Sequence, residues 1–146
     1  MIKVNIVNKS PYPIPEYGKV GNSGMDVKAW IPESITLKPL ERTLIPTGLY
    51  FEIPGDYEIQ VRPRSGLALK RGLTVLNTPG TVDANYTGEV GVILVNLSNE
   101  EQIIEPGERV AQLVFSKVDK MELVEVEEII INTERGSQGY GDSGRF

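Results

Sequence analysis

Proline and glycine interrupt this sequence at short intervals, and that punctuation limits the folds it can adopt. The 146 residues include 10 prolines and 15 glycines, and the segments between them are rich in Val, Ile and Tyr. Proline breaks helices, whereas β-branched and aromatic side chains favour strands. A chain of this length also lies near the commonest size of a single domain. We therefore expect one all-β domain rather than a bundle of helices.

Three segments show the patterns of strands. Residues 57–62 alternate polar and apolar side chains, which is typical of a strand with one buried face. Residues 90–95 and 110–115 are nearly continuous apolar runs, which predicts strands that are buried on both faces. Turn-forming residues separate such segments, at 53–56, 98–100 and 105–107. This spacing predicts a β-sandwich or a jelly roll.

The sequence also contains one candidate for a short helix. Ser65 is placed to cap the run 66–71, and Gly72 is placed to end it. Residues 121–131 are ambiguous, because their apolar positions fit either a strand or one face of a helix. We favour a strand there.

The composition changes after Asn132, where the chain becomes polar and rich in glycine. Such a segment buries too little apolar surface to fold alone. We therefore expect a core over residues 1–131 and a flexible arm over residues 132–146. A frayed terminus is the ordinary interpretation of such an arm, but Arg135 and Tyr140 stand among its glycines as candidate ligand contacts.

The composition excludes several classes of site. The chain has no Cys and no His, so disulfides and the usual zinc ligand sets are absent, and any metal should be a hard cation bound by oxygen. A net charge of −5 argues against a general nucleic-acid surface but leaves room for a small anionic ligand. Without a signal-peptide pattern or a run of transmembrane length, we expect a cytoplasmic protein, in the host cytoplasm if it is viral, with no membrane partner.

Three polar patches are candidates for contact with a ligand. Arg64, Ser65 and Gly66 place a guanidinium beside a hydroxyl at the start of the expected helix, which favours phosphate. An ordinary helix cap with a surface arginine is the alternative. Gln112 interrupts an apolar strand, and its amide must find partners, either a ligand or a structural hydrogen bond. Asp26 follows a Gly-Met pair and could equally be a turn residue.

Two further segments complete the set of candidates. Asp83 and Tyr86 lie in a short polar insert between turn signals at 78–80 and Gly88, where they could be a turn former and an aromatic cover over the core. Residues 139–144 spell the glycine pattern of dinucleotide-binding loops but lack the strand and the helix that this pattern requires. They remain a strip of N–H donors that could fold over an anion.

Together these five patches resemble, in order and in approximate spacing, the five motifs of the homotrimeric dUTPase family. The resemblance extends from Gly24 to Gly144, and the segment from Gly80 to Val92 is its most specific part. It implies a distorted jelly-roll barrel or sandwich with one short helix. It also implies a homotrimer whose active sites each take residues from three subunits, with an exchanged C-terminal arm closing over a neighbouring subunit's site.

The resemblance implies hydrolysis of dUTP to dUMP and pyrophosphate, which limits uracil incorporation into DNA and supplies dUMP for dTMP synthesis. Asp83 matches the family's catalytic Asp, which deprotonates the water that attacks the α-phosphorus. The implied cofactor is Mg²⁺, held mainly by the triphosphate, with Asp26 acting on it through water.

The resemblance also assigns the substrate contacts. Arg64, Ser65 and Gly66 of one subunit hold the triphosphate, and Gln112 adds a further phosphate contact. Tyr86 packs against deoxyribose and leaves no space for a 2′-hydroxyl. Uracil is read by Asn77 and by backbone groups of the following strand, around Val90, Gly91 and Val92. The arm contributes a stacking aromatic and phosphate contacts, from Arg135, Tyr140, Gly141 and Ser143.

Two arm residues depart from the family pattern, and two rival interpretations remain. Tyr140 stands where Phe is usual, and Asp142 stands near the expected γ-phosphate where Ser is more common. The dCTP deaminase branch of the same superfamily is the nearest rival, although the residues after Asp83 favour dUTPase. The other rival is a regulatory protein that uses its nucleotide site as a switch for a partner.

Overall fold

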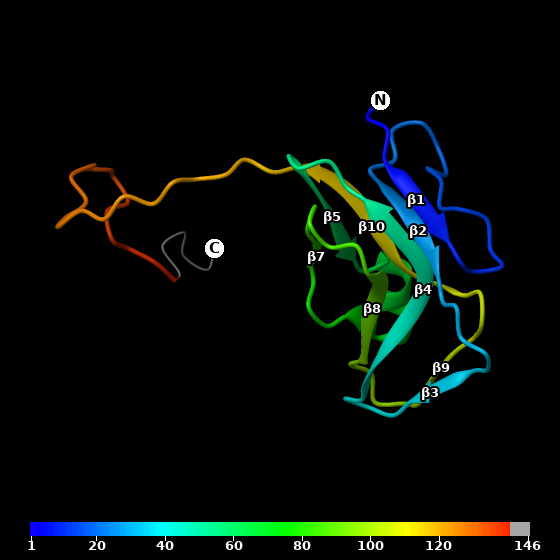
Figure 1. Ribbon diagram of the computed structural model, residues 1–146. Helices are drawn as coiled ribbons and strands as arrows, with labels where there is room; N and C mark the ends of the chain where they lie inside the picture. The colour runs from blue at the N-terminus through cyan, green and yellow to red at the C-terminus, as the bar shows by residue number, and fades with distance from the viewer. Residues whose placement is uncertain (141–146) are drawn as a thin grey trace.

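The computed structural model describes residues 1–140, which form two facing antiparallel sheets (Figure 1). The first sheet has the order β1 (Asn5–Asn8), β4 (Arg42–Glu52), β8 (Glu89–Asn96) and β6 (Leu73–Val75). The second has the order β2 (Gly24–Lys28), β10 (Arg109–Lys117), β5 (Tyr57–Arg62) and β7 (Gly80–Val82). A two-stranded ribbon joins β3 (Ile35–Leu37) to β9 (Gln102–Ile104).

Within residues 1–140, no two hydrogen-bonded neighbours in a sheet are consecutive in the sequence. The predicted turns therefore do not close hairpins. The turn at 53–56 takes the chain from β4 in one sheet to β5 in the other, and the turn at 105–107 leads from the ribbon into β10. Such crossing connections are those of a jelly-roll sandwich, so the predicted all-β fold is confirmed.

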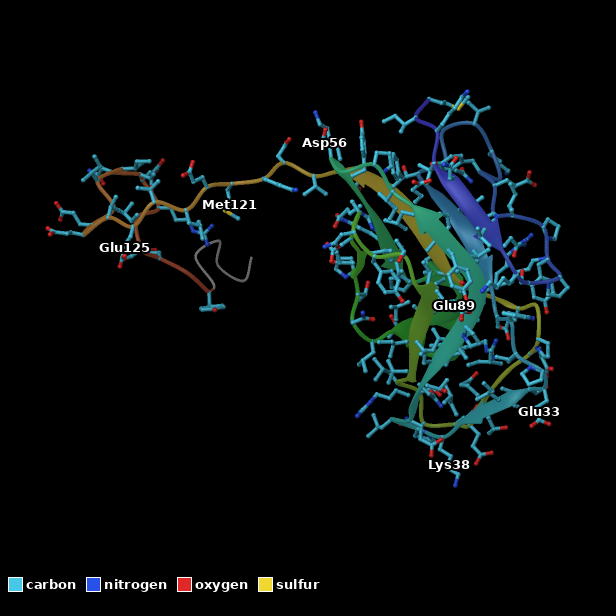
Figure 2. The ribbon with its side chains drawn as sticks, in the orientation of Figure 1. Glu33, Lys38, Asp56, Glu89, Met121 and Glu125 are labelled. Carbon is cyan, nitrogen blue, oxygen red and sulfur yellow. The ribbon has the colours of Figure 1, made fainter. Side chains whose placement is uncertain are left out.

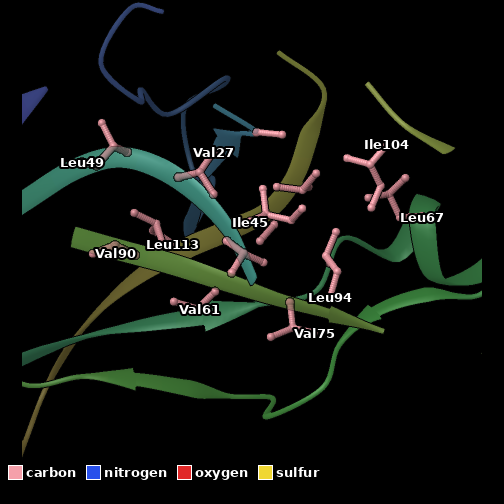
Figure 3. Packing of buried hydrophobic residues seen from close by; sticks show 14 of the residues in the cluster. Val27, Ile45, Leu49, Val61, Leu67, Val75, Val90, Leu94, Ile104 and Leu113 are labelled. Carbon is pink, nitrogen blue, oxygen red and sulfur yellow. The ribbon is translucent and has the colours of Figure 1, made fainter. Parts of the chain in front are cut away.

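The core lies between the two sheets (Figure 3). In β5 the predicted alternation is confirmed, because Ile59 and Val61 are buried while their neighbours are not. The prediction for 90–95 is wrong in part: Val90, Val92 and Leu94 are buried, but Gly91 and Ile93 are only half-buried. These two residues line a pocket instead of a second apolar layer. Each fully buried aliphatic side chain contributes about 1.5–3 kcal/mol to this core.

The helix α1 spans Ser65–Arg71 and differs from the prediction at its start. Its N-cap is Arg64, which has an extended backbone and whose carbonyl accepts the N–H groups of Leu67 and Ala68, both at 3.1 Å. No side-chain hydrogen bond caps the helix, and the exposed Ser65 is its first residue and not its cap. Gly72 ends the helix as predicted, with φ of 64°. Over residues 1–140, no helix is long and apolar enough to cross a membrane.

After β10 the chain leaves the sandwich and runs outward (Figures 1 and 2). In the described chain, its last backbone hydrogen bond to the sandwich joins the N–H of Val118 to the carbonyl of Asp56, at 2.8 Å. The strand predicted over 121–131 is wrong for the single chain, because a strand forms only where its backbone groups find a partner. Its apolar side chains are exposed, from Met121 at 84% to Ile131 at 77%. The predicted boundary between residues 131 and 132 stays a prediction.

Candidate active site

A pocket of about 490 Å³ opens where β8 runs past the end of β6. Its lining residues come from β4, β5, β7 and β8, from the segment between β6 and β7, and from the loop that follows β7. Five predicted site residues line it: Asn77, Asp83, Tyr86, Val90 and Gly91. Val92 lies on the same strand, but its side chain is fully buried in the core, so only its backbone can face a ligand. We call this the β8 pocket.

The back wall of the β8 pocket is an open strand edge. β6 pairs only with residues 94–96 of β8, and one further bond joins the N–H of Leu76 to the carbonyl of Ile93 at 2.9 Å. In the described chain, residues 89–92 have no strand neighbour on that side. The absence of a side chain at Gly91 lets Leu44 lie close to the strand, because a Cβ atom at position 91 would be 2.6 Å from Cδ1 of Leu44. Unpaired N–H and C=O groups at such an edge can bind a planar ligand through hydrogen bonds.

Asp83 and Tyr86 form the rim of the β8 pocket, in the loop between β7 and β8. The N–H of Tyr86 donates to the carbonyl of Asp83 at 3.0 Å, which closes a tight turn. The Tyr86 ring lies against Gly88, where a Cβ atom would be only 2.6 Å from the ring carbon Cζ. Tyr86 is 46% exposed, so the ring presents surface to the pocket, and the side chain of Asp83 is exposed beside it.

A second group, which we call the Asp26 cluster, lies on and beside the other sheet. It combines three predicted residues, Asp26, Arg64 and Gln112, with Arg109. Nε of Arg64 donates to Oδ1 of Asp26 at 3.0 Å, and Nε of Arg109 lies 3.8 Å from Oδ2 of Asp26. Gln112 donates through Nε2 to the carbonyl of Pro63 at 3.0 Å. Strand register explains the assembly, since Gln112 is opposite Asp26 on β2 and opposite Arg62 on β5.

The Asp26 cluster is better suited to binding an anion than to stabilising the fold. The side chains of Arg64 and Asp26 are 32% and 36% exposed, and ion pairs that solvent reaches contribute only about 0–1 kcal/mol. Two guanidinium groups face one carboxylate, which leaves one positive charge in excess. Asp26, Arg109 and Gln112 also line a second cavity of about 460 Å³.

Sequence reasoning did not identify Arg109. It lies three residues before Gln112, and in a regular strand residues at that spacing point to opposite faces. The pairing of β10 with β2 shifts register between Arg109 and Ala111, and this irregularity allows both side chains to line the same cavity. Because the bulge leaves no pattern in the residue types, the sequence held no signal for it.

The described residues contain no group of three acidic side chains that could hold a metal ion alone. Asp26 is the single carboxylate of its cluster, and Oδ2 of Asp26 is separated from Arg109 by 3.8 Å. Mg²⁺ commonly binds one or two protein carboxylates and takes its other ligands from phosphates and water. The donors present therefore suit a cation that arrives with a triphosphate.

The single chain does not bring all the predicted residues together. The β8 pocket and the second cavity share no lining residue, so Asp83 and the Asp26 cluster lie apart in one chain. Ser65 and Gly66 are exposed at the start of α1. Tyr140 is fully exposed, and Nε of Arg135 donates to the carbonyl of Gln138 at 2.9 Å. Gly141, Asp142 and Ser143 lie outside the described residues.

Comparisons with known proteins agree on one family. The family model described as dUTPase matches residues 10–144. A deoxyuridine 5′-triphosphate nucleotidohydrolase of Fusobacterium nucleatum is 56% identical over 99% of this chain and 98% of its own length. One from Aquifex aeolicus is 61% identical over 76% of this chain and 74% of its own length.

A solved structure supports the same relationship. A dUTPase variant of Staphylococcus bacteriophage 80alpha, determined with dUpNHpp, superimposes with a TM-score of 0.85. It is 28% identical in sequence, and the match covers 99% of both chains. The family model covers nearly the whole chain, and the sequence identities extend over most of it. The chain belongs to the dUTPase family.

Proposed function

We propose that this protein hydrolyses dUTP to dUMP and pyrophosphate, with water attacking the α-phosphorus. The observation that carries the proposal is the exposed Asp83 carboxylate at the rim of a pocket whose back wall is an open strand edge. A carboxylate in that place can hold a water molecule as an acceptor and take its proton as charge develops. In the cell, this reaction would limit uracil incorporation into DNA and supply dUMP for dTMP synthesis.

The open edge of β8 supports uracil as the base. Uracil presents an N3–H donor between two carbonyl acceptors, which the backbone C=O and N–H groups around Val90, Gly91 and Val92 can complement, with Asn77 nearby. Cytosine reverses the donor and acceptor polarity on that side of its ring. Leaving buried polar groups unpaired in this way costs factors of about 10⁴ or more in discrimination.

Tyr86 supports selection of the sugar. Its ring is fixed on one side by Gly88, and it presents its other surface to the β8 pocket, beside the Asp83 carboxylate. A deoxyribose stacked on this ring would leave no space for a 2′-hydroxyl. Tyr86 would therefore separate dUTP from UTP by contact with the sugar.

The Asp26 cluster supports a triphosphate site supplied by another copy of the chain. Arg64, Ser65, Gly66 and Gln112 would hold the phosphates, and the excess positive charge of the cluster favours them. Bound Mg²⁺ would neutralise charge on the pyrophosphate as it leaves. Asp26 would orient that cation through water, since its Oδ1 is already paired with Arg64.

A homotrimer with shared sites would account for the separation of Asp83 from the Asp26 cluster in one chain. Residues 121–131 expose apolar side chains that a single chain leaves uncovered, and such surface is typical of segments that pack on a partner. The arm would then close over a neighbouring subunit's site, where Arg135, Tyr140, Gly141 and Ser143 would contact the nucleotide. We place this assembly in the cytoplasm, with neither nucleic acid nor membrane as a partner.

A substrate panel tests the proposed reaction against its rivals. The assay follows pyrophosphate and ammonia from dUTP, dCTP, dTTP and UTP, each with and without Mg²⁺. We expect pyrophosphate from dUTP alone, and only with Mg²⁺. Ammonia from dCTP would establish a deaminase instead. Binding of dUTP without turnover would favour a nucleotide-dependent switch over an enzyme.

A further inference from the structure

Glu89 connects the rim of the β8 pocket to a bulge in the neighbouring strand. Its side-chain Oε1 accepts the N–H of Thr47 at 3.1 Å and the N–H of Gly48 at 2.7 Å. Its own carbonyl accepts the hydroxyl of Tyr86 at 2.8 Å. We call these three hydrogen bonds the Glu89 bridge, and Figure 2 shows Glu89 lying against β4.

The bulge explains why a side chain is needed there. The pairing of β4 with β8 shifts register between Pro46 and Tyr50, so the backbone of β8 does not continue a regular ladder across this stretch. Thr47 is only 2% exposed, and a buried N–H without a partner costs about 1–3 kcal/mol. The Glu89 carboxylate supplies the missing acceptor for two adjacent N–H groups.

The bulge is also held rigidly from its other side. Gly48 has φ of 71°, and a Cβ atom there would lie 2.8 Å from the backbone N of Ser10 and from Cε3 of Trp30. The carbonyl of Gly48 accepts the N–H of Lys9 at 2.8 Å. Because the bulge cannot shift easily, it is a fixed point from which the Glu89 carboxylate positions the start of β8.

The position of Tyr86 follows from the position of Glu89. The Tyr86 ring rests on Gly88, and within residues 1–140 its side chain forms one hydrogen bond, to the carbonyl of Glu89. We propose that Glu89 is a positioning residue for sugar selection: its carboxylate ties β8 to the β4 bulge and so fixes the Tyr86 ring against a 2′-hydroxyl. This inference rests on the proposed function, in which Tyr86 contacts deoxyribose.

The charge of Glu89 and its hydrogen bonding can be separated by substitution. A negative charge beside the pocket acts on dUTP and UTP alike, since both carry the same triphosphate. Loss of the charge therefore leaves the ratio of the two kcat/KM values unchanged. Glu89→Gln removes the charge but keeps an oxygen that accepts both N–H groups, whereas Glu89→Ala removes both.

The experiment measures kcat and KM for dUTP and UTP in wild type, E89Q, E89A and the control E52A. Glu52 lies at the end of β4 and is exposed, and its side chain, within residues 1–140, bonds only that of Asn5. We expect E89A to raise kcat/KM for UTP relative to dUTP by about 10-fold to 100-fold, the effect of a misplacement near 1 Å. E89Q should stay within a few fold of wild type, and E52A should be unchanged. Equal ratios in E89A and wild type, or equal relaxation in E89Q and E89A, would overturn the proposal.

Two further measurements keep the test decisive. Hydrogen exchange of the Thr47 and Gly48 amides, without nucleotide, should accelerate in E89A and not in E89Q, and unchanged exchange in E89A contradicts the bridge. If E89A does not fold, Tyr86→Phe breaks the same bridge at its other end and should relax the ratio in the same direction. If wild type turns over neither nucleotide, the proposed reaction is wrong. The Glu89 bridge is then tested by measuring the ratio of the affinities for dUMP and UMP in the same variants.

Discussion

Replacing Arg64 with alanine should separate the stability of this protein from its activity. The Arg64 side chain donates to Asp26 at 3.0 Å and to the carbonyl of Arg109 at 3.1 Å. Both charged partners are about one-third exposed, so water replaces the lost bonds at little cost. We expect the free energy of unfolding to fall by no more than about 2 kcal/mol, from one solvent-screened ion pair and one hydrogen bond.

Activity should respond far more strongly than stability. If Arg64 holds the triphosphate, its removal takes away a preorganised donor where charge develops. Such losses lower kcat by about 10²–10³-fold, which is about 2.7–4 kcal/mol of transition-state stabilisation. The matched control is Arg62→Ala, because Arg62 lies two residues away and is exposed, and its side chain bonds, among the described residues, only that of Gln60.

The assay for this pair of variants is steady-state hydrolysis of dUTP, with thermal unfolding and the oligomeric state measured on the same samples. R62A should keep both activity and melting temperature. R64A should keep its assembly and nearly all of its stability and lose its activity. An R64A protein that retains activity within a few fold, or one that fails to fold while R62A is normal, would refute the assignment of Arg64 to the phosphate site.

Two further predictions follow from the structure. Gly91→Ala places a Cβ atom 2.6 Å from Cδ1 of Leu44 and should raise KM for dUTP. Adding Leu44→Ala to this variant should restore part of the affinity. Equal KM values for the single and the double variant would count against the close approach at β8. Ending the chain after Asn132 should reduce turnover strongly while light scattering still shows a trimer, because the arm contributes closure and phosphate contacts more than core; loss of the trimer would show that the arm is needed for assembly.

The strands were largely predictable because their residue patterns reflect burial. Ile59 and Val61 alternate with polar neighbours, and burial on one face of β5 followed directly. The same reasoning failed for Gly91 and Ile93, since a pocket and an apolar layer favour the same small or apolar residue types. Residues 121–131 failed for another reason. A strand needs a neighbour, and none of residues 1–140 pairs with this segment.

The sequence supplied candidates for the site where polar or aromatic residues stand in short motifs. The candidate base Asp83, the aromatic Tyr86 and the arginine at position 64 could all be identified as candidates, although each also had an ordinary structural interpretation. Arg109 and Glu89 could not be identified, because bulges in β10 and β4 bring them to their places. Irregular pairing depends on contacts between distant segments and leaves no periodic signal in the sequence.

A mixing experiment tests the central claim most directly, namely that Asp83 and the Asp26 cluster work together only between chains. D83N and R64A proteins, each inactive alone, are unfolded together in equal amounts and refolded into mixed assemblies. If each site takes Asp83 from one chain and Arg64 from another, about a quarter of the sites contain both native residues, and activity returns to about a quarter of wild type. Activity no higher than that of the two separate variants would contradict the shared site.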